Sequence, residues 1–190
     1  MSITTDALKW IREEPLARHL SYLDDPLVCG RSMGETRKDL FSIPAFRKLI
    51  EEVAADPWPP INSHRSADHP LHKLSFLAEL GLDDEDLGLS DKMDKIIATT
   101  DGDGMLGLPM SIPRRYGGKQ SDETTWALCD SPTLAYSLVK LGRGKDPQVV
   151  KAVRGLIVME GPGGYRCVTS PELDSGARGE RTIPAPTRTS

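Results

Sequence analysis

The chain has 190 residues, a length at which a single domain with a substantial hydrophobic core is the usual architecture. Its formal net charge of -4 offers no clustered basic surface for nucleic acid. No apolar run reaches membrane-spanning length, and residues 1–10 lack the basic and then apolar layout of a signal peptide. We therefore expect a cytoplasmic protein with no membrane span and no nucleic-acid partner. Its cysteines, odd in number, indicate reduced thiols rather than a disulfide framework: Cys29, Cys129 and Cys167.

The first 40 residues predict a helical segment followed by a connector. Residues 7–14 follow Asp6, a good N-cap residue, and apolar positions continue the pattern to Leu20. Residues 24–38 combine Asp, Pro, Gly and mixed charge, which is typical of a connector. We expect the next helix to be capped by Ser42 and to stop at the proline-rich residues 54–60.

The most distinctive pattern occurs twice, in residues 74–106 and residues 134–166. Each copy contains a leucine-rich segment, a glycine, a polar turn, a second apolar segment and a glycine-rich turn. Equivalent glycines are about sixty residues apart: Gly81 with Gly142, and Gly104 with Gly164. A repeat of this period suits stacked helical hairpins, and it predicts hairpin repeats across residues 41–173.

Prolines mark the predicted helix starts, since the first turn of a helix tolerates a missing N–H. Ser131 and Asp146 immediately precede such prolines and are good N-cap residues. His69 immediately precedes Pro70, but histidine is not a good N-cap residue. Alternating β-branched residues are rare, so we expect an all-α fold. Residues 174–190 hold almost no apolar side chains, and we expect a disordered tail there.

Residues 126–153, WALCDSPTLAYSLVKLGRGKDPQVVKAV, and the following GGYRC resemble the α/α toroids of the terpenoid cyclase and protein prenyltransferase superfamily, in particular a poorly characterised prokaryotic group of squalene-cyclase-like proteins. The resemblance runs from about Phe46 to Leu173. It implies a partial α/α toroid of about three helical hairpins. The cyclase motif of Gln, three residues, Gly, one residue and Trp is degenerate here, with Glu160, Gly164 and Tyr165 in the second copy.

The resemblance implies a function only in part. Class II terpenoid cyclases use a D-x-D-D acid, but residues 83–86 are D-D-E-D in a turn that we expect to be solvated. The magnesium-binding D-D-x-x-D is absent too. One hypothesis is a terpenoid-cyclase-like or prenyltransferase-like protein that acts on or binds an apolar, isoprenoid-like ligand. The alternative is a noncatalytic helical-repeat scaffold for a protein or peptide, and the sequence leaves open whether the chain is an enzyme.

The resemblance also bears on residues 175–190. It implies that relatives continue with a segment like F-R-G-P-G-R-K-D-D-P-C-P-Y-A-N-L. A GC-rich coding sequence for that segment, translated one nucleotide out of frame, can give S-G-A-R-G-E-R-T-I-P-A-P-T-R-T-S, which is the string found here. This predicts a chain truncated by a frameshift after Leu173 and lacking full activity. An ordinary disordered tail is the alternative.

Alignment of the repeats on Gly81 and Gly142 places Asp68 and His69 opposite Cys129 and Asp130, at the starts of equivalent helices. Helix N-termini favour anions and thiolates. A zinc ion held by Cys129, Asp130 and Cys167 is therefore one hypothesis for a cofactor, since the superfamily includes zinc sites. The alternative is that these residues cap helices and fill the core.

Aromatic side chains suggest a ligand cavity. The candidate ligand-binding residues are Trp126, Asp130, Tyr136 and His69, with Phe76 as a further aromatic contact. The alternative is that the aromatic residues pack in the core. If the last hairpin has one uncovered side, we also expect an exposed apolar patch at Leu138, Val149, Val153 and Leu156.

Overall fold

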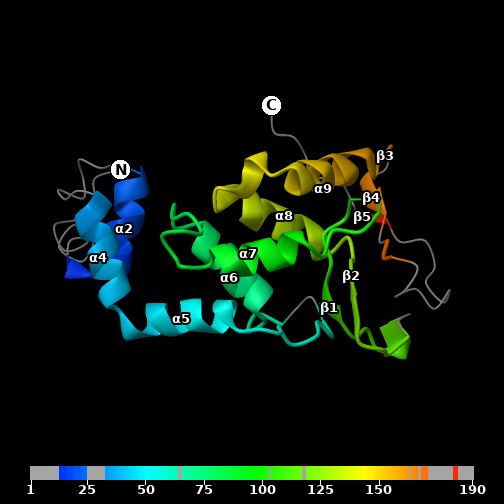
Figure 1. The fold of residues 1–190 in the computed structure, drawn as a ribbon, viewed down its shortest axis with the longest axis horizontal. Helices are drawn as coiled ribbons and strands as arrows, with labels where there is room; N and C mark the ends of the chain where they lie inside the picture. Colours follow the sequence, from blue (N-terminus) through cyan, green and yellow to red (C-terminus); the bar gives the residue numbers. More distant parts are fainter. Residues whose placement is uncertain are drawn as a thin grey trace.

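The computed structural model describes residues 13–24, 33–63, 66–102, 104–116, 119–162, 164–166, 168–170 and 182–183 (Figure 1). Within those residues the chain is mostly helical, as the sequence predicts, and it also contains two small sheets. No described helix has the length and apolar character needed to cross a membrane. The helices are α2 (Pro15–Asp24), α4 (Met33–Ser42), α5 (Pro44–Ala54), α6 (Pro70–Ala78), α7 (Ser90–Ile97), α8 (Ser131–Lys140) and α9 (Pro147–Val158).

The N-terminal region forms a pair of packed helices, α2 and α4. Most of the helix predicted at residues 7–14 lies outside the described residues. The connector predicted for residues 24–38 is wrong at its C-terminal end, because α4 begins at Met33. Thr36 and Leu40, one helical turn apart, are both buried, so α4 gains an inward side that its charged sequence conceals.

The prediction that Ser42 caps the next helix is wrong. Its hydroxyl donates to the backbone carbonyl of Asp39 at 2.6 Å, which makes it part of the last turn of α4. Ile43 occupies the N-cap position of α5, with Pro44 in the first turn. The predicted stop is confirmed, since α5 ends at Ala54.

A buried histidine joins the N-terminal pair to the rest of the chain. His19 Nε2 lies 2.7 Å from the carbonyl oxygen of Leu80, and Nδ1 lies 3.3 Å from the Thr36 hydroxyl. A carbonyl oxygen can only accept, so Nε2 carries the proton and donates. His19 thereby connects α2, α4 and the end of α6.

Each copy of the repeat contains two helices, α6 and α7 in the first copy and α8 and α9 in the second, and α9 packs against α8. The glycines that define it share a left-handed backbone: φ is 65° at Gly81, 94° at Gly142, 91° at Gly104 and 97° at Gly164. Residues with a Cβ rarely adopt this conformation, which explains why glycine recurs at these turns. The repeat therefore has its origin in backbone geometry.

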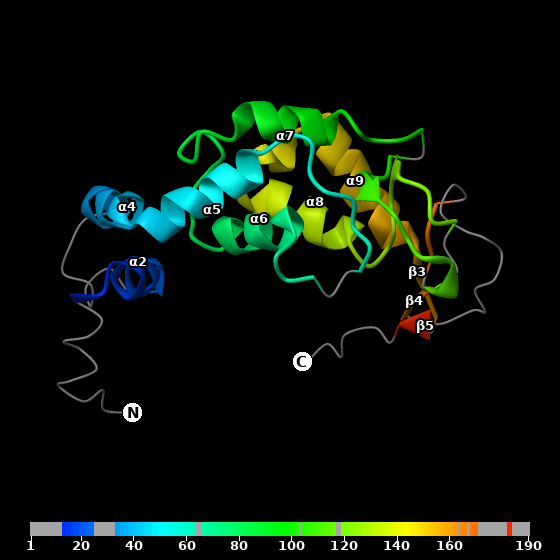
Figure 2. The ribbon, with the colours of Figure 1, turned by 90° about the horizontal axis from the view of Figure 1, so that it is seen from below.

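The first helices of the hairpins, α6 and α8, pack against each other, and α9 packs against α8. Figure 2 shows α7 along the upper edge of this region and α6 and α8 below it. The interfaces bury leucines at helical spacing. Among those that are fully inaccessible are Leu71, Leu74, Leu77, Leu134 and Leu138.

The exposed apolar patch expected along α8 and α9 is wrong. Leu138 and Val149 are fully buried, and Val153 and Leu156 are partly buried against the core; α9 packs against α8. The exposed apolar residues of α9 are instead at its end, where Ile157 is 60% and Val158 is 80% exposed.

The acidic segment 83–86 links the hairpins. Asp83 and Glu85 are exposed, as predicted for a solvated turn, but that prediction is wrong for Asp84, whose side chain is only 7% exposed. Arg143 donates to Asp84 Oδ2 from Nη2 at 2.7 Å and from Nε at 2.9 Å. The Asp84 amide also donates to Leu141 O at 3.1 Å. The turns after α6 and α8 are therefore held together by a nearly buried ion pair.

Two short sheets complete the fold. β1 (Leu108–Met110) pairs antiparallel with β2 (Glu123–Thr125), and β3 (Glu160–Gly161), β4 (Gly164–Arg166) and β5 (Thr182–Ile183) form the second sheet. Strands this short show no alternating pattern in the sequence, so they were not predicted. β5 belongs to the segment predicted to be disordered, whose other residues lie outside the described part of the chain.

Candidate functional site

The structure confirms that His69 and Asp130 occupy equivalent positions, since they are the N-cap residues of α6 and α8. His69 caps α6 although its residue type argued against it. Its Nδ1 accepts from the Leu71 amide at 3.1 Å, and Nε2 lies 2.8 Å from the carbonyl of Pro59, to which it donates. Burial lowers the pKa of His69, which keeps the ring neutral as this arrangement requires. Both ring nitrogens thus have protein partners, and a ligand would have to displace one.

The region around Asp130 packs tightly against neighbouring segments. Asp130 and Trp126 are buried, and Cys129 is partly buried. Ser131 is the first residue of α8 rather than its cap, and its hydroxyl donates to Leu106 O at 3.3 Å. The carbonyl of Trp126 accepts from the Ser170 amide at 3.1 Å.

The predicted zinc site is not tested by this arrangement, because Cys167 lies outside the described residues. Across the part of the chain that the structure describes, no three His, Cys, Asp or Glu side chains gather in a group that could hold a metal ion. Cys129 and Asp130 are neighbours at the start of α8, where Asp130 occupies the N-cap position without a side-chain cap hydrogen bond.

Accessible aromatic side chains are present on both α6 and α8. Phe76 is 44% and Tyr136 45% exposed. The Tyr136 hydroxyl donates to the Glu79 carboxylate, and Lys140 Nζ lies 4.0 Å from Glu79 Oε2. Phe76 precedes Glu79 by three residues and Tyr136 precedes Lys140 by four, so each pair lies on one side of its helix. We call Phe76, Glu79, Tyr136 and Lys140 the α6–α8 face.

Charge and aromatic surface are combined on this face. The hydrogen bond to Glu79 raises the pKa of Tyr136, so the phenol stays protonated. Lys140 Nζ lies 6.0 Å from the centre of the Tyr136 ring, at the outer limit of a cation–π contact. The polar tip of Tyr136 is engaged, and both aromatic rings keep accessible surface.

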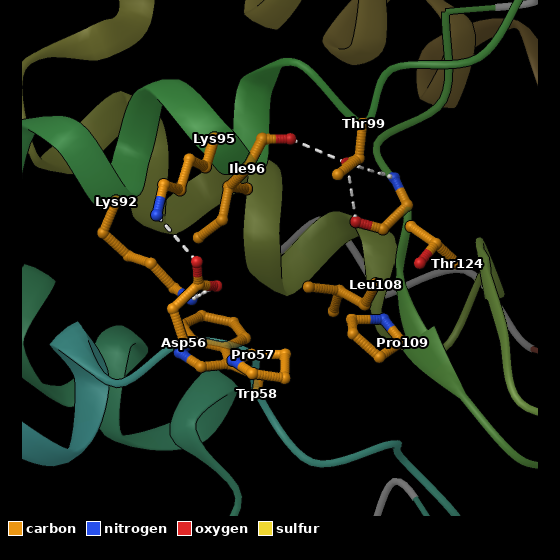
Figure 3. A pocket seen from close by; sticks show the side chains of 11 residues that line it. Asp56, Pro57, Trp58, Lys92, Lys95, Ile96, Thr99, Leu108, Pro109 and Thr124 are labelled. Atoms are coloured by element: carbon orange, nitrogen blue, oxygen red, sulfur yellow. Dashed lines mark hydrogen bonds and ion pairs between the residues drawn. The ribbon is translucent and has the colours of Figure 1, made fainter.

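A second feature is a hollow of about 200 Å³ between the end of α5, α7 and the β1–β2 ribbon (Figure 3). Asp56 accepts hydrogen bonds there from Lys92 at 2.9 Å and from Lys95 at 2.7 Å. These two lysines, Lys95 above all, lower the pKa of Asp56 from 3.8 to about 2. The sequence did not reveal this hollow, since its walls come from separate segments and its lysines look like an ordinary solvated helix side.

Compared with known proteins, the chain matches no protein-family model, no curated protein and no solved structure.

Proposed function

We propose that this chain is a helical-hairpin protein of the α/α-toroid type, and that its α6–α8 face binds an apolar, isoprenoid-like ligand. The toroid part of the proposal is supported by the direct packing of α6 on α8 and of α9 on α8. In a toroid the first helices of successive hairpins lie side by side and face the ligand, while the second helices lie outside.

The observation that carries the proposal is the accessibility of Phe76 and Tyr136 on neighbouring helices. Large aromatic surface is costly to leave in water and is commonly found at binding sites. The polar end of Tyr136 already bonds Glu79, so the remaining ring surface suits an apolar partner. Glu79 and Lys140 border this surface with opposite charges.

Binding is favoured over acid catalysis by the state of Asp84, the buried carboxylate of the D-D-E-D segment. An acid catalyst must hold a proton that it can donate to the substrate. Asp84 instead accepts two N–H bonds from the guanidinium of Arg143 and is only 7% exposed, so its carboxyl group is held in an ion pair and is not presented to a substrate. We therefore propose a binder rather than a cyclase.

Titration with a fluorescent farnesol analogue tests the proposal. Phe76→Ser and Tyr136→Ser should each weaken binding about tenfold, because an aromatic contact is worth about 1–1.5 kcal/mol. Tyr136→Phe keeps the ring and should bind nearly as well as the parent chain. Val158→Ser, on the 80% exposed end of α9, is the matched control and should have no effect.

Two outcomes would contradict the proposal. The first is that the parent chain fails to bind the analogue. The second is binding that both serine variants leave unchanged. Saturable binding of apolar peptides, without binding of the isoprenoid analogue, would favour the noncatalytic scaffold instead.

A further inference from the structure

From the hollow beside α7 we infer a second binding site, for a small organic monocarboxylate with a flat apolar body. This site is independent of the α6–α8 face and uses none of its residues. Figure 3 shows Lys92 and Lys95 descending from α7 toward Asp56, with Leu108 and Pro109 of the β1 strand on the opposite side.

The two lysines differ in how many of their hydrogen-bond donors remain available for a ligand. Lys92 is nearly buried: its ammonium donates to Asp56 at 2.9 Å and to Ala55 O at 2.8 Å, and it lies 4.9 Å from the centre of the Trp58 ring. Lys95 donates to Asp56 at 2.7 Å, and its side chain is 62% exposed. Because an ammonium has three donors, Lys95 can give further hydrogen bonds to an incoming anion.

The charge of the lining favours an anion. Two ammonium groups face one carboxylate, and the pKa of about 2 means that Asp56 is ionised at neutral pH. Asp56 raises the pKa of Lys95 and keeps it charged, and Asp91, one turn earlier on α7, adds a smaller effect in the same direction. Asp91 does not line the hollow. Among the described residues that line the hollow, Asp56 is the only carboxylate, and it is already paired with Lys92 and Lys95. A cation would therefore be repelled by these two ammonium groups.

The remaining walls set the shape of the ligand. Pro57, Ile96, Leu108 and Pro109 supply apolar and largely rigid surfaces. A volume of about 200 Å³ holds roughly ten non-hydrogen atoms at the packing density of protein interiors. A nucleotide or a drug-sized molecule needs more space. One aromatic or alicyclic ring with a single carboxylate fits both the volume and the charge.

The threonines have distinct roles. The Thr99 hydroxyl lies 2.7 Å from Ile96 O and 2.8 Å from Gly107 O, and it accepts from the Gly107 amide at 3.2 Å, so it fastens the entry to β1 against α7. Thr124 is exposed on β2, across the hollow from Lys95 (Figure 3). We place the carboxylate of the ligand at Lys95 and the far edge of its ring near Thr124.

Benzoate is a suitable probe, with benzamidinium as a partner of the same shape and opposite charge. In amide NMR spectra of the full chain, benzoate should produce saturable shifts at residues 95, 96, 108 and 124, with a millimolar dissociation constant. Benzamidinium should produce none of these shifts. Lys95→Gln should weaken benzoate binding at least fivefold, while Lys48→Gln, a 75% exposed lysine of α5, should leave it unchanged.

The inference is overturned if benzoate shifts do not saturate, if benzamidinium produces the same shifts, or if Lys95→Gln binds benzoate as the parent chain does. A dispersed spectrum of Lys95→Gln verifies its fold. Because Phe76 and Tyr136 are unchanged in this variant, farnesol-analogue binding should persist. Failure of the carboxylate site is thus distinguishable from failure of the α6–α8 face.

Discussion

Replacement of Arg143 by methionine should destabilise the chain by about 3 kcal/mol. The substitution keeps most of the apolar stem and removes both donors to Asp84, a carboxylate that is only 7% exposed. Breaking a buried pair by removing one partner costs about 3–5 kcal/mol, because the remaining charge is left desolvated. The lower end applies here, since Arg143 itself is 24% exposed and part of its charge is solvated.

Substitution of the partner residue, Asp84, should cost less. In Asp84→Asn the guanidinium keeps Asp94, 2.9 Å away, and retains its access to water. We expect a loss of about 1–2 kcal/mol, near the low end of the range of about 1.5–3 kcal/mol for hydrogen bonds to charged groups, because the amide oxygen of Asn can still accept from Arg143. The double variant should be about 1.5 kcal/mol more stable than the sum of the single losses predicts. Each single variant leaves one member of the Asp84–Arg143 pair without its partner, whereas the double variant removes both charged groups.

Urea unfolding followed by circular dichroism at 222 nm measures these differences. Arg154→Met is a matched control, since Arg154 is exposed on α9. It should change the free energy of unfolding by less than about 0.5 kcal/mol. The reasoning is refuted if Arg143→Met costs less than about 1 kcal/mol, or if the single effects add within about 0.3 kcal/mol.

Three further predictions follow from single residues. Gly142→Ala should lose about 1–2 kcal/mol in urea unfolding because φ is 94° there, whereas Gly34→Ala, inside α4 with open space at the added carbon, should be neutral or stabilising; equal effects would argue against the left-handed turn. Asp56 has a lowered pKa, so its contribution to stability is complete above about pH 4 and is lost as pH falls toward 2; Asp56→Asn should flatten that part of an acid-unfolding curve, and an unchanged curve would contradict the lysine pairing. The pKa of His69 is lowered by burial, so the unfolded chain takes up this proton first and stability falls as pH drops through 6.5; His69→Gln should weaken that dependence between pH 7.5 and 5.5, and a steeper one would show that the ring is not held neutral.

The hairpins could be predicted because their signals are local. Proline in the first turn and glycine in the left-handed turn are set by the backbone of a few consecutive residues, so Pro132 and Gly142 carry their meaning in the sequence alone. The equivalence of His69 and Asp130, at the starts of α6 and α8, was predicted from the alignment of the two copies on their glycines. The prediction that His69 is a poor cap was wrong, since its second bond goes to the carbonyl of Pro59, ten residues away.

The remaining features depend on distant contacts. α4 has a charged sequence, and its helix is stabilised by the burial of Thr36 and Leu40 against other elements. Asp84 is buried because Arg143, on the second hairpin, pairs with it. The hollow needs the end of α5, α7 and the β1–β2 ribbon together. No pattern within a single segment carries this information.

The exposed patch expected along α8 and α9 shows how an assumption about assembly can mislead. The apolar side of α9 was expected to await a further hairpin, but Val149 is buried by α8 within the same hairpin. Accessible aromatic surface is present on α6 and α8, where Phe76 and Tyr136 stay half exposed, and we propose the ligand site there. Function is therefore better sought on the first helices of the hairpins than on the last one.

Photoaffinity mapping tests that central claim most directly. The full chain is irradiated with a diazirine-bearing farnesol analogue, and the labelled residues are identified by mass spectrometry with and without excess farnesol. We predict competed label within α6 and α8, concentrated around Phe76 and Tyr136. Label that farnesol does not compete, or competed label confined to Ile157 and Val158 at the end of α9, would contradict the assignment of the α6–α8 face as the ligand site.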